Sequence, residues 1–354
     1  MTSPSPAPLY LAEILDPAWL RPRLYPDQPS LRITGAREIW REENTATKVR
    51  VELDLENAAP GTGRTICIKG MIDESGMKWV SSGTSATESH FYAQMAPGLA
   101  AAGINVPDCL YTAIDPENGH GLLIMKDMVV EGATFLTALT PYSPDQARDS
   151  LAQLARLHVE TGAGKPLHDM AFKGITLDRL AAESLIPLDM LQGLLDDPRG
   201  APLAAEVKNA GRLHRSLGAL RDCFAGEPTC IVHGDAHAGN LYRKDGAAGI
   251  IDWQVVQHGH WAQDVAYHIV AALSVEDRRA HGDALLDVYL AERARLGDPV
   301  ADHDTARAHF RAAVVYGYYM WGVTRRVRPD IIREFVKRLG LAVTEYRSFE
   351  LLGV

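Results

Sequence analysis

Cysteine is scarce in this sequence, and its spacing forms no motif. The four cysteines are Cys67, Cys109, Cys223 and Cys230, and no two of them form a CxxC pair. This spacing gives no support to a dithiol or zinc-ribbon site and favours free thiols in a reducing compartment. No apolar run is long enough to span a bilayer. The first residues, MTSPSPAPLY, lack the basic start and apolar centre of a signal peptide. We therefore expect a cytoplasmic protein that does not enter membranes.

Basic residues are fewer than acidic residues in this chain. The chain has 36 lysines and arginines against 45 acidic residues, which gives a formal net charge of -9. This balance argues against nucleic acid or an anionic membrane as the main partner. The remaining composition, 46% hydrophobic and 23% charged over 354 residues, is that of an ordinary globular protein with one large or two medium domains.

Strand signals dominate the front third of the chain. Residues 1–30 are proline-rich with a short helical pattern at 9–15, and we expect them to pack on the domain that follows. Apolar alternation predicts strands at residues 31–40, 47–55, 64–70, 109–114 and 121–125. A segment of uncertain order, residues 71–85, precedes a helix predicted over residues 86–102.

Helical signals take over from residue 141. Ser143 is a candidate cap, Pro144 follows in the first turn, and Leu151, Leu154 and Leu157 recur at helical spacing. Further helices are predicted at residues 202–224, 261–273, 275–296, 305–322 and 329–346. A strand-rich front and a helical rear predict two lobes with a boundary near residue 127.

The stretch from Cys230 to Asp264, CIVHGDAHAGNLYRKDGAAGIIDWQVVQHGHWAQD, concentrates the residues that could carry chemistry. A polar loop at 233–240 is followed by short strands at 241–243 and 249–251, with a hairpin signal, Asp245-Gly246, between them. Asp235, Asn240 and Asp252 therefore stand at the ends of a small β unit. Phosphoryl transfer needs such a set, because a carboxylate orients and deprotonates the attacking hydroxyl while oxygen ligands hold Mg²⁺ on the nucleotide phosphates.

Lys69 and Glu88 form a second candidate pair. Alternation in the strand RTICIKG places Lys69 on the same face as Cys67. Glu88 shares a helix face with Phe91 and Met95, where a carboxylate is costly unless it is paired. The nearest candidate partner is Lys69.

These residues carry a resemblance to a known family. The spacing from Asp235 to Asn240 matches the Asp-x4-Asn of the protein-kinase catalytic loop, with HGD in place of HRD. HGDAHAGN followed by IDWQ resembles the aminoglycoside phosphotransferase and choline kinase superfamily. Gln254 within IDWQ is similar to the ecdysteroid-kinase-like branch, whose domain is called CHK kinase-like.

The resemblance covers roughly residues 30–345 and implies an α+β, bilobal, protein-kinase-like fold. An antiparallel sheet with one long helix would form a nucleotide-binding lobe, residues 1–127, with residues 1–30 as its lead-in. A mainly helical lobe, residues 128–354, would carry the catalytic loop and the acceptor site.

Each candidate residue receives a role from the same resemblance. Asp235 would be the catalytic base, Asp264 would support the loop, and Asn240 and Asp252 would bind Mg²⁺. Lys69, held by Glu88, would contact the ATP phosphates. Cys67 would face adenine, and the backbone of Lys126 and Met128 would bond it. Thr45, within the turn REENTA at residues 41–46, and Thr47, just after it, would cover the phosphates.

The resulting prediction is an ATP- and Mg²⁺-dependent kinase that phosphorylates a small-molecule hydroxyl. Aminoglycosides, amino alcohols such as choline, steroid alcohols and hydroxyacyl thioesters all stay open as acceptors. A hydrophobic alcohol or hydroxyacyl thioester is preferred by analogy with the IDWQ branch. The oligomeric state is not predicted.

Two other functions stay open at this point. A pseudokinase would bind nucleotide without transferring phosphate. A metallohydrolase would use a cluster of the residues His233, Asp235, His237, His258 and His260, because zinc sites use His and Asp at such short spacings. For His233 itself we expect a structural role, with its ring bonding backbone inside the loop.

Overall fold

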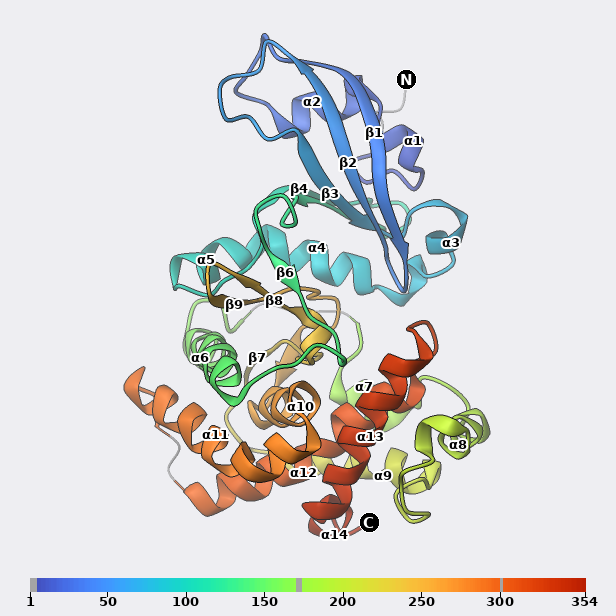
Figure 1. Cartoon of the computed structure of the whole chain (residues 1–354), viewed down its shortest axis with the longest axis vertical. Coiled ribbons are helices and arrows are strands. Elements are labelled where there is room, and N and C mark those ends of the chain that lie inside the picture. The colour runs from blue at the N-terminus through green and yellow to red at the C-terminus, as the bar shows by residue number, and fades with distance from the viewer. Residues whose placement is uncertain (1–4, 170–173, 300–301) are drawn as a thin grey trace. The chain divides into compact units, whose positions relative to one another are not determined.

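An antiparallel sheet precedes a set of helices in the computed structural model, which describes residues 5–169, 174–299 and 302–354 (Figure 1). The chain divides into two compact units. The first is built mainly from the residues up to Ala100 and from Val106–Thr134, and the second from Ala101–Asn105 and most of the chain after Phe135. The predicted α+β class, with a sheet in the N-terminal lobe and a mainly helical C-terminal region, is confirmed. None of the described helices combines the length and apolar character of a membrane span.

Five antiparallel strands form the sheet of the first unit. Their order is β1 (Arg32–Glu43), β2 (Thr47–Glu56), β3 (Thr65–Gly70), β5 (Gly121–Lys126) and β4 (Cys109–Ile114). Alternation along β2 buries Val49, Val51 and Leu53 in one core with α1 (Leu11–Ile14) and α2 (Pro17–Leu24). The prediction that the lead-in packs on the sheet is confirmed, although α2 itself was not predicted.

The segment between β3 and β4 differs from its prediction in two ways. Residues 71–85 contain α3 (Asp73–Met77), η1 (Val80–Ser82) and the start of α4 (Thr84–Gln94). The helix predicted over 86–102 is two helices, because α4 ends before Met95 and α5 spans Ala96–Ala101. Pro97 explains the break, since it lacks the N–H that would bond the carbonyl of Ala93.

Helices make up most of the second unit (Figure 1). The capping box at Ser143 is present, with its hydroxyl accepting from the Gln146 N–H. The helix predicted from residue 202 begins only at Ala210, where Asn209 is the cap, and the three helices between residues 177 and 200 were not predicted. The helices are α6 (Pro144–Glu160), α7 (Leu177–Ala182), α8 (Leu188–Asp196), η2 (Pro198–Gly200), α9 (Ala210–Cys223), α10 (Ala262–Ala272), α11 (Val275–Arg295), α12 (His303–Val323), α13 (Pro329–Glu345) and α14 (Ser348–Leu351).

Short strands position the central stretch between α9 and α10. Strand β7 (Cys230–Val232) pairs with β10 (Gln257–Gly259), while β8 (Leu241–Lys244) pairs with β9 (Ala247–Ile250). The β8–β9 sheet has β6 (Thr134–Phe135) as its third strand, and η3 (Ala238–Asn240) precedes β8. Asp245 and Gly246 have φ of 52° and 81°, as the predicted two-residue hairpin requires.

Candidate active site

The predicted ion pair between Lys69 and Glu88 is present in the first unit. Lys69 Nζ lies 2.8 Å from Oε1 and 2.7 Å from Oε2 of Glu88. The two side chains are 4% and 2% exposed, so each charge depends on the other to offset its loss of hydration. Phe91 of α4 and Met95, which follows its last residue, are both buried. Strand β3 and helix α4 therefore hold a fixed cation at the sheet, while its contact with a nucleotide stays a prediction.

The turn predicted to cover phosphates is shorter than expected. Arg41, Glu42 and Glu43 continue β1 and pair with β2, which leaves only residues 44–46 as the turn. Thr45 is exposed at its tip. Thr47 is buried, and its hydroxyl donates to the Ile72 carbonyl at 3.3 Å. Because that hydroxyl has a single proton, it cannot also donate to a phosphate.

Cys67 lies on β3 opposite Met125 of β5. Burial raises the pKa of its thiol to about 11, so the side chain is a neutral thiol at physiological pH. A neutral thiol behaves as a small apolar side chain, while its contact with adenine stays a prediction.

The segment after β5 is anchored by contacts that the sequence did not reveal. Asp127 accepts from Arg50 Nε of β2 at 2.9 Å and from the Val129 N–H at 3.1 Å. Lys126 donates its backbone N–H to Asp108 O at 3.1 Å, and the Met128 carbonyl accepts from the Ala133 N–H at 2.9 Å. A base bound here would therefore use the Lys126 carbonyl and the Met128 N–H.

Asp235 is the carboxylate of the 233–240 loop, in the second unit, and it is partly accessible. Its side chain is 28% exposed. Oδ1 accepts from Tyr267 Oη at 2.8 Å, and Oδ2 accepts from Asn240 Nδ2 at 3.0 Å and faces His237 Nε2 at 3.4 Å. Burial alone would raise the pKa of Asp235, but His237 and the other polar neighbours outweigh it and hold that pKa below its usual value. The loop therefore presents an ionised, oriented carboxylate.

A backbone hydrogen bond links Asn240 to the residue before Asp252. Asn240 Nδ2 also donates to the Asp235 carbonyl at 2.9 Å, which turns the amide oxygen away from Asp235. The N–H of Ile251, one residue before Asp252, donates to the Asn240 carbonyl at 2.9 Å. Asp252 itself has φ of 67°. Such a left-handed conformation is uncommon outside glycine and is often found at functional sites.

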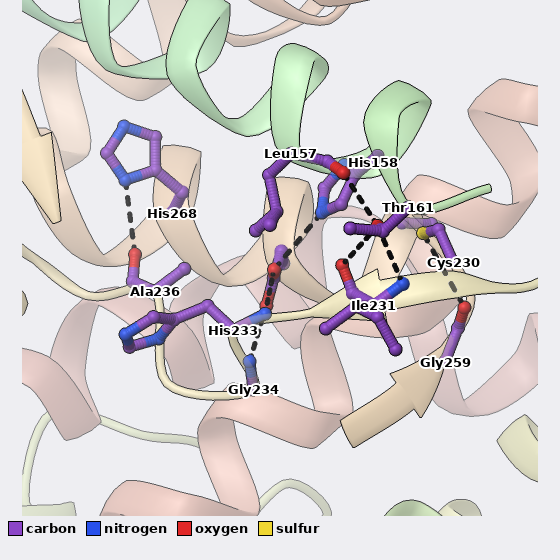
Figure 2. A network of polar contacts seen from close by, with 12 residues as sticks. Leu157, His158, Thr161, Cys230, Ile231, His233, Gly234, Ala236, Gly259 and His268 are labelled. Carbon is purple, nitrogen blue, oxygen red and sulfur yellow. Dashed lines mark hydrogen bonds and ion pairs between the residues drawn. The ribbon is translucent and has the colours of Figure 1, made fainter. Parts of the chain in front are cut away.

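Asp264 supports the loop from α10, as predicted. Its carboxylate accepts from the backbone N–H groups of His233 at 2.6 Å and Gly234 at 2.8 Å (Figure 2). His158 Nε2 donates to the same carboxylate at 3.1 Å and its Nδ1 accepts from Tyr289. Burial, only partly opposed by Asp264, lowers the pKa of His158, so the ring acts as a neutral donor.

A comparison with known protein families matches a region that includes this loop. A family model described as "Phosphotransferase enzyme family" matches residues 77–307, which is well over half of the chain. The chain belongs to that family. The match includes Glu88, Asp235, Asn240 and Asp252 and begins after Lys69. No curated protein matches the sequence of this phosphotransferase.

Solved structures confirm the kinase-like fold of this phosphotransferase. A putative aminoglycoside phosphotransferase from Ralstonia eutropha JMP134 is similar with a TM-score of 0.53 and 15% identity, over 93% of this chain and 96% of that one. A choline kinase from Cryptosporidium parvum Iowa II has a TM-score of 0.50 and 10% identity, over 92% and 90%. A Plasmodium vivax ethanolamine kinase has a TM-score of 0.50 and 14% identity, over 93% and 86%.

The histidines of this phosphotransferase do not form the metal cluster that was considered. His233 Nε2 bonds the Ile251 carbonyl at 2.9 Å and its Nδ1 accepts from the Asp235 N–H at 3.2 Å, so both ring nitrogens are used. The structural role expected for His233 is therefore confirmed. Across the described residues, the only three-residue group with metal-ligand proximity is Glu227, His260 and His309, all within 4.8 Å. Among the five residues considered, only His260 belongs to it.

Proposed function

We propose that this phosphotransferase transfers the γ-phosphoryl group of ATP, bound with Mg²⁺, to a hydroxyl of a small molecule. The observation that carries the proposal is the 233–240 loop, where an accessible carboxylate on Asp235 is held by the amide of Asn240. Asp235 accepts the acceptor's proton and directs its oxygen toward the γ-phosphorus. Catalysis then depends mainly on positioning and electrostatics.

The donor set suits the proposed cation. Asn240 Oδ1 and the Asp252 carboxylate are hard oxygen ligands of the kind that Mg²⁺ takes. Bound there, Mg²⁺ would neutralise charge between the β- and γ-phosphates. The amide of Asn240 also donates to the Asp235 carboxylate. We therefore propose that Asn240 links the cation ligands to the general base.

The nucleotide contacts of the proposal come from residues 1–127, with residues 1–30 as lead-in, and from the adjoining Met128. Lys69, held by Glu88, contacts the α- and β-phosphates. Cys67 faces adenine, the Lys126 carbonyl and the Met128 N–H bond it, and the backbone at Thr45 and Thr47 covers the phosphates. The catalytic loop and the acceptor site belong to residues 128–354.

The acceptor is proposed from sequence resemblance alone. Gln254 follows Asp252 in the IDWQ motif of the ecdysteroid-kinase-like branch, which favours a hydrophobic alcohol or hydroxyacyl thioester. Choline, ethanolamine and aminoglycosides are the alternatives that the related proteins suggest by name.

The test is a transfer assay with labelled ATP, Mg²⁺ and a panel that holds one alcohol of each of these classes. Asp235→Asn should abolish transfer while calorimetry shows Mg-ATP binding largely kept. Asp245→Asn, at the exposed tip of the β8–β9 hairpin, is the matched control and should transfer like the wild type. Wild-type transfer by Asp235→Asn would overturn the mechanism, and Mg-ATP binding without turnover would favour the pseudokinase.

A further inference from the structure

One face of α10 holds four successive residues of the catalytic loop. Asp264 accepts from the N–H groups of residues 233 and 234, and His268 donates from Nδ1 to the carbonyl of residue 236 at 3.1 Å (Figure 2). Tyr267 donates to the side chain of residue 235. Tyr267 and His268 lie three and four positions after Asp264, which places both next to it on one side of the helix. Three of these four hydrogen bonds reach backbone, and only that of Tyr267 reaches the reacting carboxylate.

Tyr267 is a rigid donor. Its side chain is 1% exposed, and its ring lies where a Cβ on Gly317 of α12 would come within 2.7 Å. Burial, reinforced by Asp235, raises the pKa of Tyr267 well above its usual value. The hydroxyl therefore keeps its proton and donates it to Asp235 Oδ1 at 2.8 Å.

The contacts of Asp235 distinguish its two oxygens. Oδ2 accepts from Asn240 and faces His237 Nε2, and both of these partners belong to the loop itself. Oδ1 accepts from Tyr267 alone among the described contacts. A carboxylate oxygen has about two acceptor directions. Oδ2 is therefore occupied, while Oδ1 keeps one direction for a substrate.

We propose that Tyr267 is a positioning residue of the transfer reaction, and that Oδ1 of Asp235 is the oxygen that takes the acceptor's proton. This inference rests on the proposed function. The acceptor O–H bond breaks with its proton passing to Oδ1, while the acceptor oxygen forms a bond to the γ-phosphorus. The bond from the γ-phosphorus to the bridging oxygen breaks, and its electron pair leaves with ADP. Tyr267 fixes the rotation of the carboxylate, so that the free direction of Oδ1 points at the acceptor.

A purely structural role is the competing explanation, because the ring is buried. Tyr267→Phe keeps the ring and removes only the hydroxyl. Tyr318→Phe is the matched control, since Tyr318 is also fully buried and its hydroxyl donates to the Val207 carbonyl at 3.2 Å, away from the loop. Both variants lose one buried hydrogen bond, and only one of those bonds reaches Asp235.

The experiment measures turnover of Mg-ATP to ADP, with water and with each alcohol of the acceptor panel, together with the melting temperature and the KM for ATP. We expect Tyr267→Phe to lower kcat roughly 10- to 100-fold, the loss of a hydrogen bond to a charged group. The KM for ATP should change less than about threefold and melting should match that of Tyr318→Phe.

Two outcomes would overturn the inference. An unchanged kcat would remove the positioning role, while a joint loss of kcat, ATP affinity and melting temperature, or a failure to fold, would assign Tyr267 a structural one. Both results leave the proposed function standing if Asp235→Asn still abolishes transfer. Wild-type transfer by Asp235→Asn would instead remove the proposed function itself.

Discussion

Lys69 Nζ lies 2.7 Å from Glu88 Oε2, and both side chains are almost completely buried. Removing one partner of such a pair leaves a charge without compensation, which costs about 3–5 kcal/mol. We expect Glu88→Gln to lower the melting temperature and to raise the KM for ATP about tenfold, because Lys69 loses its orientation. Glu56→Gln is the control, since its pair with Arg32 on the same sheet is exposed and surface pairs contribute little. Unchanged ATP affinity in Glu88→Gln would contradict the role of the pair.

Asp252 combines a left-handed backbone with a proposed cation ligand. Asparagine tolerates the same conformation, so Asp252→Asn should fold normally while losing the charge. We expect the Mg²⁺ concentration for half-maximal activity to rise roughly tenfold or more, which a Mg²⁺ titration of ATP turnover measures. Asp245→Asn repeats the change at φ of 52° in the exposed hairpin turn and should leave the Mg²⁺ dependence unchanged. An equal response in both variants would remove Asp252 from the cation site.

Gly234 is required by both conformation and space. Its φ is 79°, and a Cβ would lie 2.4 Å from the Val255 carbonyl oxygen. Gly226 has a similar φ of 85° with nothing within 4 Å of a Cβ. Gly226→Ala should therefore cost about 1 kcal/mol of unfolding free energy from conformation alone, whereas Gly234→Ala should cost about 1–3 kcal/mol more and abolish transfer. Denaturant unfolding of both variants makes the comparison, and equal losses would show that the clash is relieved without cost.

Buried histidines predict acid sensitivity of the fold. Burial lowers the pKa of His268 to about 4, and its ring donates to Ala236 while accepting from Ser150. The unfolded chain binds this proton near pH 6.5 and the folded protein only near pH 4. Stability contributed by the neutral ring is therefore complete above pH 6.5 and falls by about 1.4 kcal/mol per pH unit as the pH decreases toward 4.

Unfolding measured at pH 7.5, 6 and 5 tests this dependence. His158, His233 and His260 also have lowered pKa values because of burial. The pH dependence of the wild-type unfolding free energy should therefore correspond to more than one proton bound on unfolding. Glutamine in His268→Gln can hydrogen bond both Ala236 and Ser150. The variant should therefore bind up to one proton fewer on unfolding than the wild type. A wild-type stability that is independent of pH over this range would show that the buried rings are solvated.

Local signals in the sequence were sufficient for many elements. The cap at Ser143, the Asp245-Gly246 hairpin and the later helices each depend on a few neighbouring residues, and all are present. The Lys69–Glu88 pair was also predictable, because an acid on an apolar helix face needs a partner. The start of α9 was placed too early, since the apolar pattern before Asn209 continues through residues that belong to turns.

Contacts between distant elements were not predictable in the same way. In the sequence, Tyr267 is indistinguishable from the apolar residues around it in α10. Asp127 is likewise only a polar residue that follows a strand. Their partners, Asp235 and Arg50, lie 32 and 77 residues away in the chain. No periodicity reports which side chains meet across such separations, so the positioning contacts of the site required the structure.

The four cysteines of the chain differ in exposure, which allows one of them to be labelled selectively. Cys223, at the end of α9, is the only exposed cysteine of the four, all of which are described. Burial raises the pKa of Cys67 to about 11 and that of Cys109 to about 12, and Cys230 is buried. Maleimide dyes react with accessible thiolate, so labelling should stop at one fluorophore per chain. A second cysteine introduced on the exposed edge of β1 would then allow energy-transfer measurements with and without added Mg-ATP.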